Sequence, residues 1–224
     1  MAILIRRAVP AQPLGVIRAI TSSGSYGPGS VTAVGPTSRI KHNLQLATGS
    51  DAASRAAEVL VEALRESSSF MSATWIDAMT TPLFCRYEPG MTYGDHVEAG
   101  MMGEAPMQMR CDIAVTVWLV DGASYEGGEL LTDTDGSGGG QSWKGDAGDC
   151  VIYAADTVHR VAPVTRGVRE VAVFWVQTMI RDEWQRRILF DLLQVLERLQ
   201  AGPSPGPEAE TLRRIYHNLI RRWA

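Results

Sequence analysis

The sequence predicts a mainly β domain, an antiparallel sandwich or barrel, with flanking helices. The middle of the chain contains several short runs of β-branched and aromatic residues, separated by pieces rich in glycine and aspartate. The segments on either side of this region carry apolar residues at the spacing of amphipathic helices. At 224 residues, the chain is long enough to bury one core of this kind.

Composition and charge narrow the classes of function. The formal net charge is -4, which gives no reason to expect nucleic acid or an anionic membrane surface as a partner. The three cysteines are an odd number without a Cys-x-x-Cys pair, so we expect neither a disulfide framework nor a zinc site, and a reducing cytoplasmic location. The pattern of apolar residues predicts no signal peptide and no membrane span.

The N-terminal part divides into an irregular segment and a helix. Residues 1–50 hold short apolar runs interrupted by Gly, Pro and Ser, as in SSGSYGPGSVTAVGPTS, and we expect loops and short strands there. The segment Asp51–Ser67 has helical spacing, and Ser50 or Asp51 would cap its start. The apolar positions that repeat at this spacing are Ala56, Leu60, Val61 and Leu64.

The middle of the chain reads as strands joined by turns. The turn-rich pieces are DGASYEGGEL and DTDGSGGGQSWKGDAGD, and the glycine-rich GSGGG is expected to be a flexible hairpin tip. That tip lacks the Lys-Ser/Thr pair of a phosphate-binding loop, so it does not predict a phosphate site. The predicted strands are PLFCRYEPG, IAVTVWLV, DCVIYAAD and REVAVFWVQTM.

The C-terminal part is helical again. RDEWQRRILFDLLQVLERLQ has one apolar stripe, AGPSPGPE is a linker, and AETLRRIYHNLIRRWA closes the chain. The apolar faces of these helices must pack against another apolar surface, which is either the β core or a second subunit in a homodimer. We therefore expect residues 181–224 to form a helical extension beside a main domain that spans residues 1–180.

The stretch YGDHVEAG suggests a metal site. Side chains alternate along an extended segment, so His96 and Glu98 point the same way. His159 lies between two distant strands, where a hairpin would place it near the mouth of a barrel. Two imidazoles and one carboxylate form the facial triad of non-haem Fe(II) oxygenases, although zinc or manganese could occupy the same ligands. The alternative is that these are ordinary loop residues.

The two remaining histidines do not join this set. His42 lies beside Lys41, whose positive charge disfavours a metal ion. His217 lies in an amphipathic helix, where a surface or packing role is expected.

Arg169 is a candidate anchor for an anionic cosubstrate. It begins the strand REVAVFWV ten residues after His159, so it can point into the same cavity. A guanidinium pairs bidentately with a carboxylate. A dicarboxylate such as 2-oxoglutarate could therefore meet the metal at one end and Arg169 at the other. The alternative is a surface arginine paired with Glu170.

Several pieces of the chain, taken together, have a recognisable pattern. These pieces lie between about Arg39 and the C-terminus. The pieces are RIKHNLQL, CRYEPGMTYGDHVEAG, YEGGELLT, GDCVIYAADTVHRVAPVTRGVREVAVFWVQTMIRD, ILFDL and IYHNLIRRW. In these the chain resembles the PKHD-type hydroxylases, the bacterial, iron-uptake-associated branch of the Fe(II)/2-oxoglutarate dioxygenases related to prolyl 4-hydroxylases.

The resemblance implies a double-stranded β-helix (jelly-roll, cupin-like) core with flanking helices. It also implies O2 as a cosubstrate and ascorbate as a reductant. Tyr87 is a further candidate for a hydrogen bond to 2-oxoglutarate, and Tyr153 is a weaker one that could instead belong to the core. The implied ligands are His96, Glu98 and His159 for iron, and Arg169 for 2-oxoglutarate.

The implied activity is hydroxylation of an unactivated carbon, coupled to conversion of 2-oxoglutarate to succinate and CO2. The substrate stays open between an amino-acid-like molecule, a peptide and another metabolite. A non-catalytic binding protein on the same fold, responsive to iron or 2-oxoglutarate, is the alternative function, and a metal-free interaction domain is a third. Methionines beside the metal motif predict an adaptable apolar rim or a mobile loop, namely Met101, Met102, Met107 and Met109.

One position departs from the family pattern, because Glu98 stands where the family normally carries Asp. Glutamate keeps the charge and the ligand oxygen and is one methylene longer. We therefore expect iron binding to persist, while the orientation of the oxidising chemistry, and with it the substrate, can differ from the family's.

Overall fold

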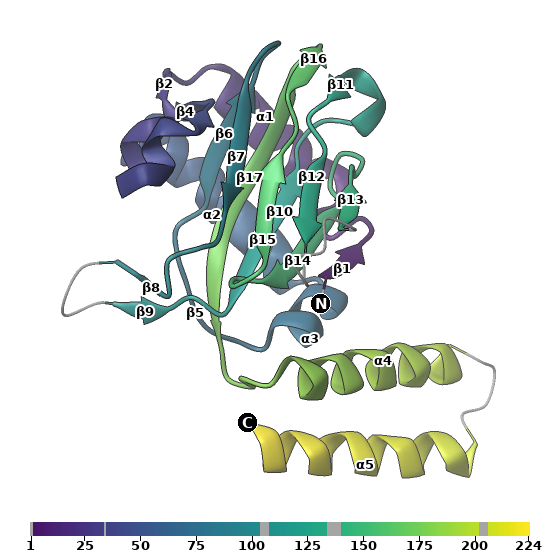
Figure 1. Ribbon diagram of the computed structural model, residues 1–224. Coiled ribbons are helices and arrows are strands. Elements are labelled where there is room, and N and C mark those ends of the chain that lie inside the picture. The colour runs from purple at the N-terminus through teal and green to yellow at the C-terminus, as the bar shows by residue number, and fades with distance from the viewer. Residues whose placement is uncertain (1, 34, 104–107, 134–139, 202–205) are drawn as a thin grey trace.

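The computed structural model describes residues 2–33, 35–103, 108–133, 140–201 and 206–224 (Figure 1). Two antiparallel sheets face each other in this part of the chain, as the sequence predicts for a sandwich, and they do not close into a barrel. The larger sheet has the order β1-β14-β10-β17-β6-β4-β2, and β5 also pairs with β17. Its strands are β1 (Ala2–Ile5), β14 (Cys150–Ala154), β10 (Ile113–Trp118), β17 (Arg169–Thr178), β6 (Leu83–Tyr87), β4 (Leu44–Leu46), β2 (Tyr26–Pro28) and β5 (Ile76–Met79).

The smaller sheet has the order β13-β12-β15-β7-β3. Its strands are β13 (Gln141–Trp143), β12 (Leu130–Asp133), β15 (Val158–Val161), β7 (Thr92–His96) and β3 (Lys41–His42). Two short pairs complete the β structure: β8 (Met101–Met102) with β9 (Met109–Arg110), and β11 (Glu126–Gly127) with β16 (Val164–Arg166). Residues 134–139, which include most of the predicted glycine-rich tip, lie outside the described residues; β12 and β13 pair on either side of them.

Strand β17 shows how the larger sheet separates two environments. Its side chains alternate between two faces, as in any extended strand. Ala172, Phe174 and Val176 face a core that the N-terminal helices complete. Arg169, Val173 and Trp175 instead face the smaller sheet. The site is therefore built on the inner face, and the helices stabilise the sheet from behind (Figure 1).

The helix α2 (Asp51–Arg65) confirms the prediction for this segment. The Ser50 side chain accepts a hydrogen bond from the backbone N–H of Ala53, which satisfies one of the free donors at the helix start. Helix α3 (Ser68–Thr74) follows, with Ser67 as the corresponding cap. The α2 residues that pack against the larger sheet are Ala53, Ala56, Ala57, Leu60, Ala63 and Leu64.

The expectation of loops and short strands over residues 1–50 is wrong for one segment. Helix α1 (Ala11–Ser22) buries Leu14, Ile17 and Thr21 on one face, against α2 and the larger sheet. Pro13 and Gly15 look like helix breakers in the sequence. However, Pro13 occupies the first turn, where a backbone N–H has no partner within the helix in any case. Short 3-10 turns, η1 (Gly29–Thr32) and η2 (Gly35–Arg39), follow β2.

The C-terminal helices α4 (Glu183–Gln200) and α5 (Pro207–Trp223) lie side by side below the sheets (Figure 1). A third apolar cluster joins them to Trp75 and Ile180, and it takes in Leu212, Leu219 and Trp223. Their apolar stripes are thus covered in part by the chain itself, while Trp184 stays 68% exposed. A homodimer through this surface remains a prediction. In the described residues, no helix has the length and apolar character needed to cross a membrane.

Candidate functional site

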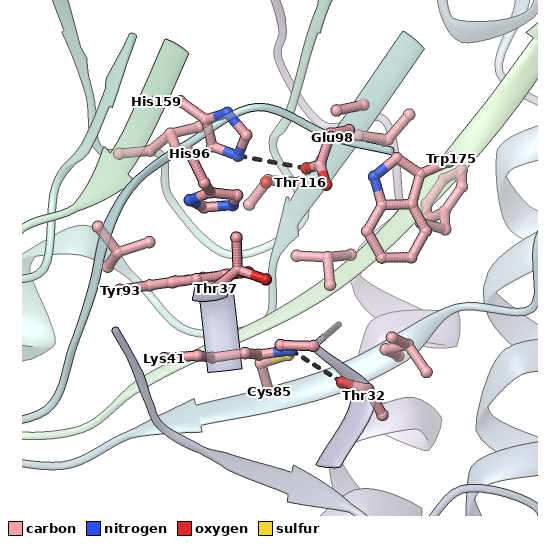
Figure 2. A pocket seen from close by; sticks show the side chains of 18 of the residues that line it. Thr32, Thr37, Lys41, Cys85, Tyr93, His96, Glu98, Thr116, His159 and Trp175 are labelled. Carbon is pink, nitrogen blue, oxygen red and sulfur yellow. Dashed lines mark hydrogen bonds and ion pairs between the residues drawn. The ribbon is translucent and has the colours of Figure 1, made fainter. Parts of the chain in front are cut away.

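A cavity of about 440 Å³ lies between the two sheets. Side chains from the larger sheet form one wall, and β3, β7 and β15 of the smaller sheet form another. Its charged and polar residues include His96, Glu98, His159, Arg169 and Lys41. Figure 2 shows the metal-binding candidates on one side of this cavity and Lys41 on the other.

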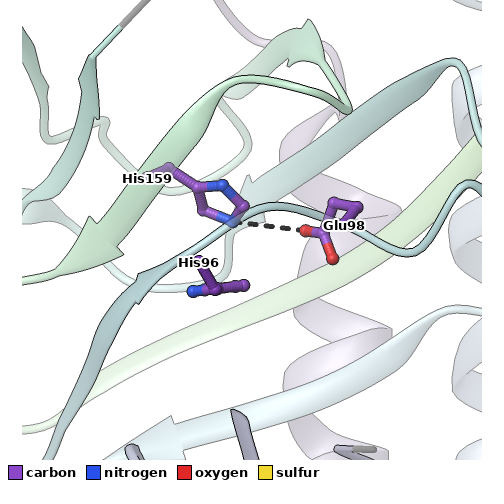
Figure 3. Close-up of side chains that lie close together, drawn as sticks. All are labelled: His96, Glu98 and His159. Carbon is purple, nitrogen blue, oxygen red and sulfur yellow. Dashed lines mark ion pairs between the residues drawn. The ribbon is translucent and has the colours of Figure 1, made fainter. Parts of the chain in front are cut away.

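The structure brings together the three residues that the sequence predicts as metal ligands. One ligand atom from each of His96, Glu98 and His159 lies within 4.8 Å of the others (Figure 3). His96 and His159 are direct cross-strand partners on β7 and β15, and their ring centres are 4.1 Å apart. Glu98 follows β7 and lies on the same side as His96, while Asp95 points away to pair with Arg160, as expected. Val97, which was expected to point away as well, also lines the cavity, because the strand ends at His96.

The prediction that His159 lies at a hairpin turn is wrong in detail. His159 is inside the short strand β15, between β7 and β12. The sequence obscures this strand because it is only VHRV, with Pro163 following closely. The other two histidines stay outside the site, as predicted: His42 and His217 are exposed.

The two imidazoles are oriented by their own backbone. Nδ1 of His96 lies 2.8 Å from the Gly94 carbonyl oxygen, and Nδ1 of His159 lies 3.0 Å from that of Thr157. A carbonyl oxygen only accepts, so each Nδ1 carries the proton and donates it. In its neutral form each ring then has its lone pair on Nε2, which is the arrangement that a metal ligand requires.

The protonation states of the three candidate ligands favour binding of a cation between them. Burial, and then the neighbouring His159, lower the pKa of His96 to about 4, so its ring is neutral near pH 7. Burial raises the pKa of Glu98, but the hydrogen bond and positive charge of His159 in its protonated form, followed by the charge of protonated His96, lower it further than burial raises it. Glu98 is therefore a carboxylate. Nε2 of His159 lies 3.2 Å from Oε1 of Glu98, and two lone-pair atoms at that distance need a proton or a metal ion between them.

Trp175 is a residue of the site that the sequence analysis did not single out. Its indole lies beside Glu98 in Figure 2, and this neighbour contributes to the lowered pKa of the carboxyl. The indole Nε1 is buried and has no hydrogen-bond partner at standard geometry among the described residues. Every second residue of β17 lies on the same face, so Trp175, six positions after Arg169, shares the inner face with it. This strand periodicity is the signal in the sequence that identifies Trp175.

Arg169 points into the cavity, as predicted, and is only 1% exposed. The alternative pairing with Glu170 is wrong, because Glu170 binds Arg86 at 2.8 Å. The Arg169 guanidinium lies 4.9 Å from the centre of the Tyr87 ring, its cross-strand partner. Its Nε and Nη1 are buried without a hydrogen-bond partner in the described structure. A buried guanidinium with unused donors is a site for an anion.

Tyrosines line the space between these groups. Tyr87 and Tyr153 are both buried, and burial raises the pKa of each above its usual value, so both keep their hydroxyl proton. Tyr93 stacks on His96 with 3.7 Å between ring centres. Among the predicted rim methionines, Met102 lines the cavity, Met101 is 51% exposed and Met107 lies outside the described residues.

Lys41 also lines the cavity, although the sequence suggests a role for it only as a neighbour of His42. It is 8% exposed, whereas the adjacent His42 faces solvent. The two-residue strand β3 is too short for a periodic signal, so the inward direction of Lys41 was not visible in the sequence.

Comparison with known proteins gives a consistent family match. Residues 82–177 match the 2OG-Fe(II) oxygenase superfamily, and residues 183–224 match the PKHD-type hydroxylase C-terminal domain. A PKHD-type hydroxylase of Beijerinckia indica is 37% identical over 227 residues, which cover 100% of this chain and 99% of that protein. One from Methylobacterium nodulans is 40% identical over 215 residues, with 94% and 93% covered.

Solved structures share the fold at low sequence identity. A prolyl hydroxylase of Trichoplax adhaerens, in complex with a hypoxia inducible factor peptide fragment, has a TM-score of 0.60 at 14% identity, covering 84% of this chain and 86% of its own. A Pseudomonas putida prolyl-4-hydroxylase has a TM-score of 0.51 at 16% identity, covering 79% and 92%. The jelly-roll prediction is thereby confirmed, as two facing sheets without a closed barrel.

Proposed function

The chain belongs to the PKHD-type hydroxylases, within the 2OG-Fe(II) oxygenase superfamily, and we propose that it hydroxylates an unactivated carbon of an amino-acid-like, peptide or metabolite substrate. The enzyme is a 2-oxoglutarate-dependent dioxygenase. In the proposed reaction, one oxygen atom of O2 enters the hydroxylated product and the other enters succinate, while the 1-carboxylate of 2-oxoglutarate leaves as CO2. Ascorbate is the proposed reductant that returns oxidised metal to Fe(II).

In this proposal His96, Glu98 and His159 hold the Fe(II). The geometry of the donors supports this assignment, because both Nδ1 protons are fixed on backbone carbonyls and both Nε2 atoms are left as ligands. Two imidazoles and one carboxylate are also the donor set of non-haem Fe(II) oxygenases. Bound iron supplies the activation of O2, and the protein supplies binding, orientation and a dry surrounding.

Arg169 holds the distal carboxylate of 2-oxoglutarate in this proposal, with Tyr87 beside it. The observation that carries the assignment is the buried guanidinium, whose Nε and Nη1 have no partner among the described residues and which lines the same cavity as the triad. A carboxylate would satisfy both the charge and the donors. The Tyr87 hydroxyl, protonated because burial raises its pKa, is available as a second donor.

Formation of succinate tests the proposal. The iron-loaded protein is incubated with 2-oxoglutarate in air, with and without a panel of amino acids and peptides, and succinate is quantified by mass spectrometry. We expect slow succinate release without substrate, faster release with the right substrate, and none from His159→Ala. Binding of iron and 2-oxoglutarate without any succinate would instead support the non-catalytic binding protein.

A further inference from the structure

Lys41 is a buried cation that the proposed reaction does not use. Its Nζ lies 2.9 Å from Oγ1 of Thr32 and 3.3 Å from Oε1 of Gln45, and both acceptors are neutral. An ammonium has three N–H donors, and no acceptor in the described part of the chain takes the third. No carboxylate forms an ion pair with Lys41 there. Lysine is rarely buried unless its charge is compensated.

The charges that line the cavity leave Lys41 unbalanced. Among the described lining residues, those of acidic or basic type are Lys41, Glu98 and Arg169, beside the two histidines. Burial lowers the pKa of Lys41, as expected for an ammonium without a paired carboxylate. Glu98 and Arg169 cancel each other. On the proposed function, Fe(II) and the 2-oxoglutarate dianion cancel as well. One positive charge, that of Lys41, then remains in the loaded cavity.

The position of Lys41 in the fold indicates that it does not bind the cosubstrate. Arg169 comes from β17 in the larger sheet and is almost fully buried, whereas Lys41 comes from β3, at the edge of the smaller sheet. Lys41 contacts Thr32 at the end of η1, a segment whose Val31 is 79% exposed. Lys41 is therefore held by residues of the N-terminal part of the chain, and it lies on a different sheet from Arg169. It is also close to the reacting centre, because its Nζ is 5.5 Å from the centre of the Tyr93 ring, which stacks on His96.

We propose that Lys41 determines substrate specificity by binding a carboxylate of the primary substrate, so that the molecule hydroxylated is an anion. One lysine charge and one free N–H donor match a single carboxylate, whereas a phosphate dianion would leave a negative charge unpaired. The carboxylate could belong to a free acid or to an Asp or Glu side chain of a peptide. This inference rests on the proposed function for its charge balance, and deepens it by naming the substrate class.

The chain allows a direct observation of Lys41, because its sequence contains only one other lysine, Lys144. Lys144 donates to the Tyr125 carbonyl oxygen and lies outside the described cavity lining, so it is a matched reference. Protein labelled with 13C and 15N in lysine is loaded with Zn(II), which is redox-inert, and with 2-oxoglutarate. Two carboxylate probes are then added in separate titrations: acetate, and an amidated tripeptide with a central Asp. The uncharged control for acetate is acetamide, and the control for the peptide is the same tripeptide with Asn in place of Asp.

We expect the Lys41 side-chain signal to shift saturably with at least one carboxylate probe and with neither neutral match, while the Lys144 signal stays in place. A response to acetate alone would assign the site to free acids, and one to the Asp peptide alone would assign it to peptides. A Lys41 signal that no carboxylate moves would make Lys41 a structural lysine. A signal moved by 2-oxoglutarate and by nothing else would place it in the cosubstrate site. Either result would overturn the proposal.

Variants separate this inference from the proposed function. Lys41→Met keeps the length of the side chain and removes the charge, and we expect it to weaken binding of the active probe by about tenfold or more, as loss of a buried ion pair does. Its affinity for 2-oxoglutarate, measured by calorimetry on the Zn(II)-loaded protein, should stay within about twofold of wild type. Lys144→Met should change neither value. Failure of wild-type protein to bind 2-oxoglutarate would contradict the proposed function, independently of the response of Lys41.

Discussion

Nε2 of His159 and Oε1 of Glu98 face each other at 3.2 Å across the end of the cavity. The opposite nitrogen of His159 is already fixed as a donor to the Thr157 carbonyl. Strand pairing and backbone hydrogen bonds thereby hold Nε2 against the carboxylate, so that a proton or a metal ion must lie between them. Because a bound metal ion takes the place of that proton, metal binding is expected to release a proton and to stabilise the fold.

The pH dependence of the metal-free protein should reveal the environment of His96. Its pKa is lowered from 6.5 to about 4 in the folded state, first by burial. The unfolded chain therefore binds more protons than the folded chain between these values, so stability is full above about pH 6.5 and falls as the pH drops toward 4. Urea unfolding from pH 7 to pH 4 measures this slope. In His96→Gln the free energy of unfolding should change less with pH over the same range. An equal slope in both proteins would show that His96 is not the group responsible.

Trp175→Phe should weaken metal binding while keeping the ring that packs beside Glu98. The change removes the buried indole N–H that lies beside Glu98 and contributes to its lowered pKa, and loss of a group that orients a ligand typically costs about 10-fold to 100-fold in metal affinity. Zn(II) affinity measured by competition with a chelator checks this. Trp75→Phe is the control, because it removes another unpartnered indole N–H in the C-terminal cluster. Equal affinity in both variants would rule out an orienting role for Trp175.

Ser50→Ala should destabilise the protein without affecting ligand binding. Ser50 accepts from the Ala53 backbone N–H at the start of α2, and loss of such a cap typically costs about 1 kcal/mol. Urea unfolding measures the difference in the free energy of unfolding. Ser54→Ala, at an exposed position of the same helix, should have little effect or a slightly stabilising one. Equal stability in the two variants would mean that water replaces the cap at no cost.

Leu189→Ala tests whether the C-terminal helices fold together with the sheets. Leu189 is fully buried in the cluster between α4 and α5, and its truncation should cost about 2–5 kcal/mol. If residues 1–180 and 181–224 unfold as one unit, this cost shifts the whole transition seen by circular dichroism. Trp184→Ala, at a 68% exposed position of α4, should shift it little. A new early transition, with the main one unchanged, would show that the extension unfolds separately.

The parts of the fold with strong local patterns could be predicted from the sequence. The β-branched run that became β17 alternates faces over ten residues, so both its strand structure and the inward direction of Arg169 follow from the sequence. Helix α2 likewise repeats its alanines and leucines at helical spacing behind a Ser cap.

The features that the sequence did not reveal depend on short or non-local elements. Helix α1 was obscured by Pro13 and Gly15, although its first turn tolerates a proline. Lys41 lies in a two-residue strand, where no period can be read. The pairing of His96 with His159 joins strands far apart in the chain, and only the folded sheet sets that register.

An anaerobic titration of the metal-free protein with Fe(II) and 2-oxoglutarate shows whether His96, Glu98 and His159 hold iron and whether Arg169 holds the cosubstrate. Chelation of iron by 2-oxoglutarate produces a weak visible charge-transfer band. We expect this band in the wild type, its loss in Glu98→Ala because iron is no longer held, and its weakening in Arg169→Ala because the cosubstrate loses its anchor. Absence of the band with no iron retained by the wild type, or an undiminished band in both variants, would show that these residues do not form an iron and 2-oxoglutarate site.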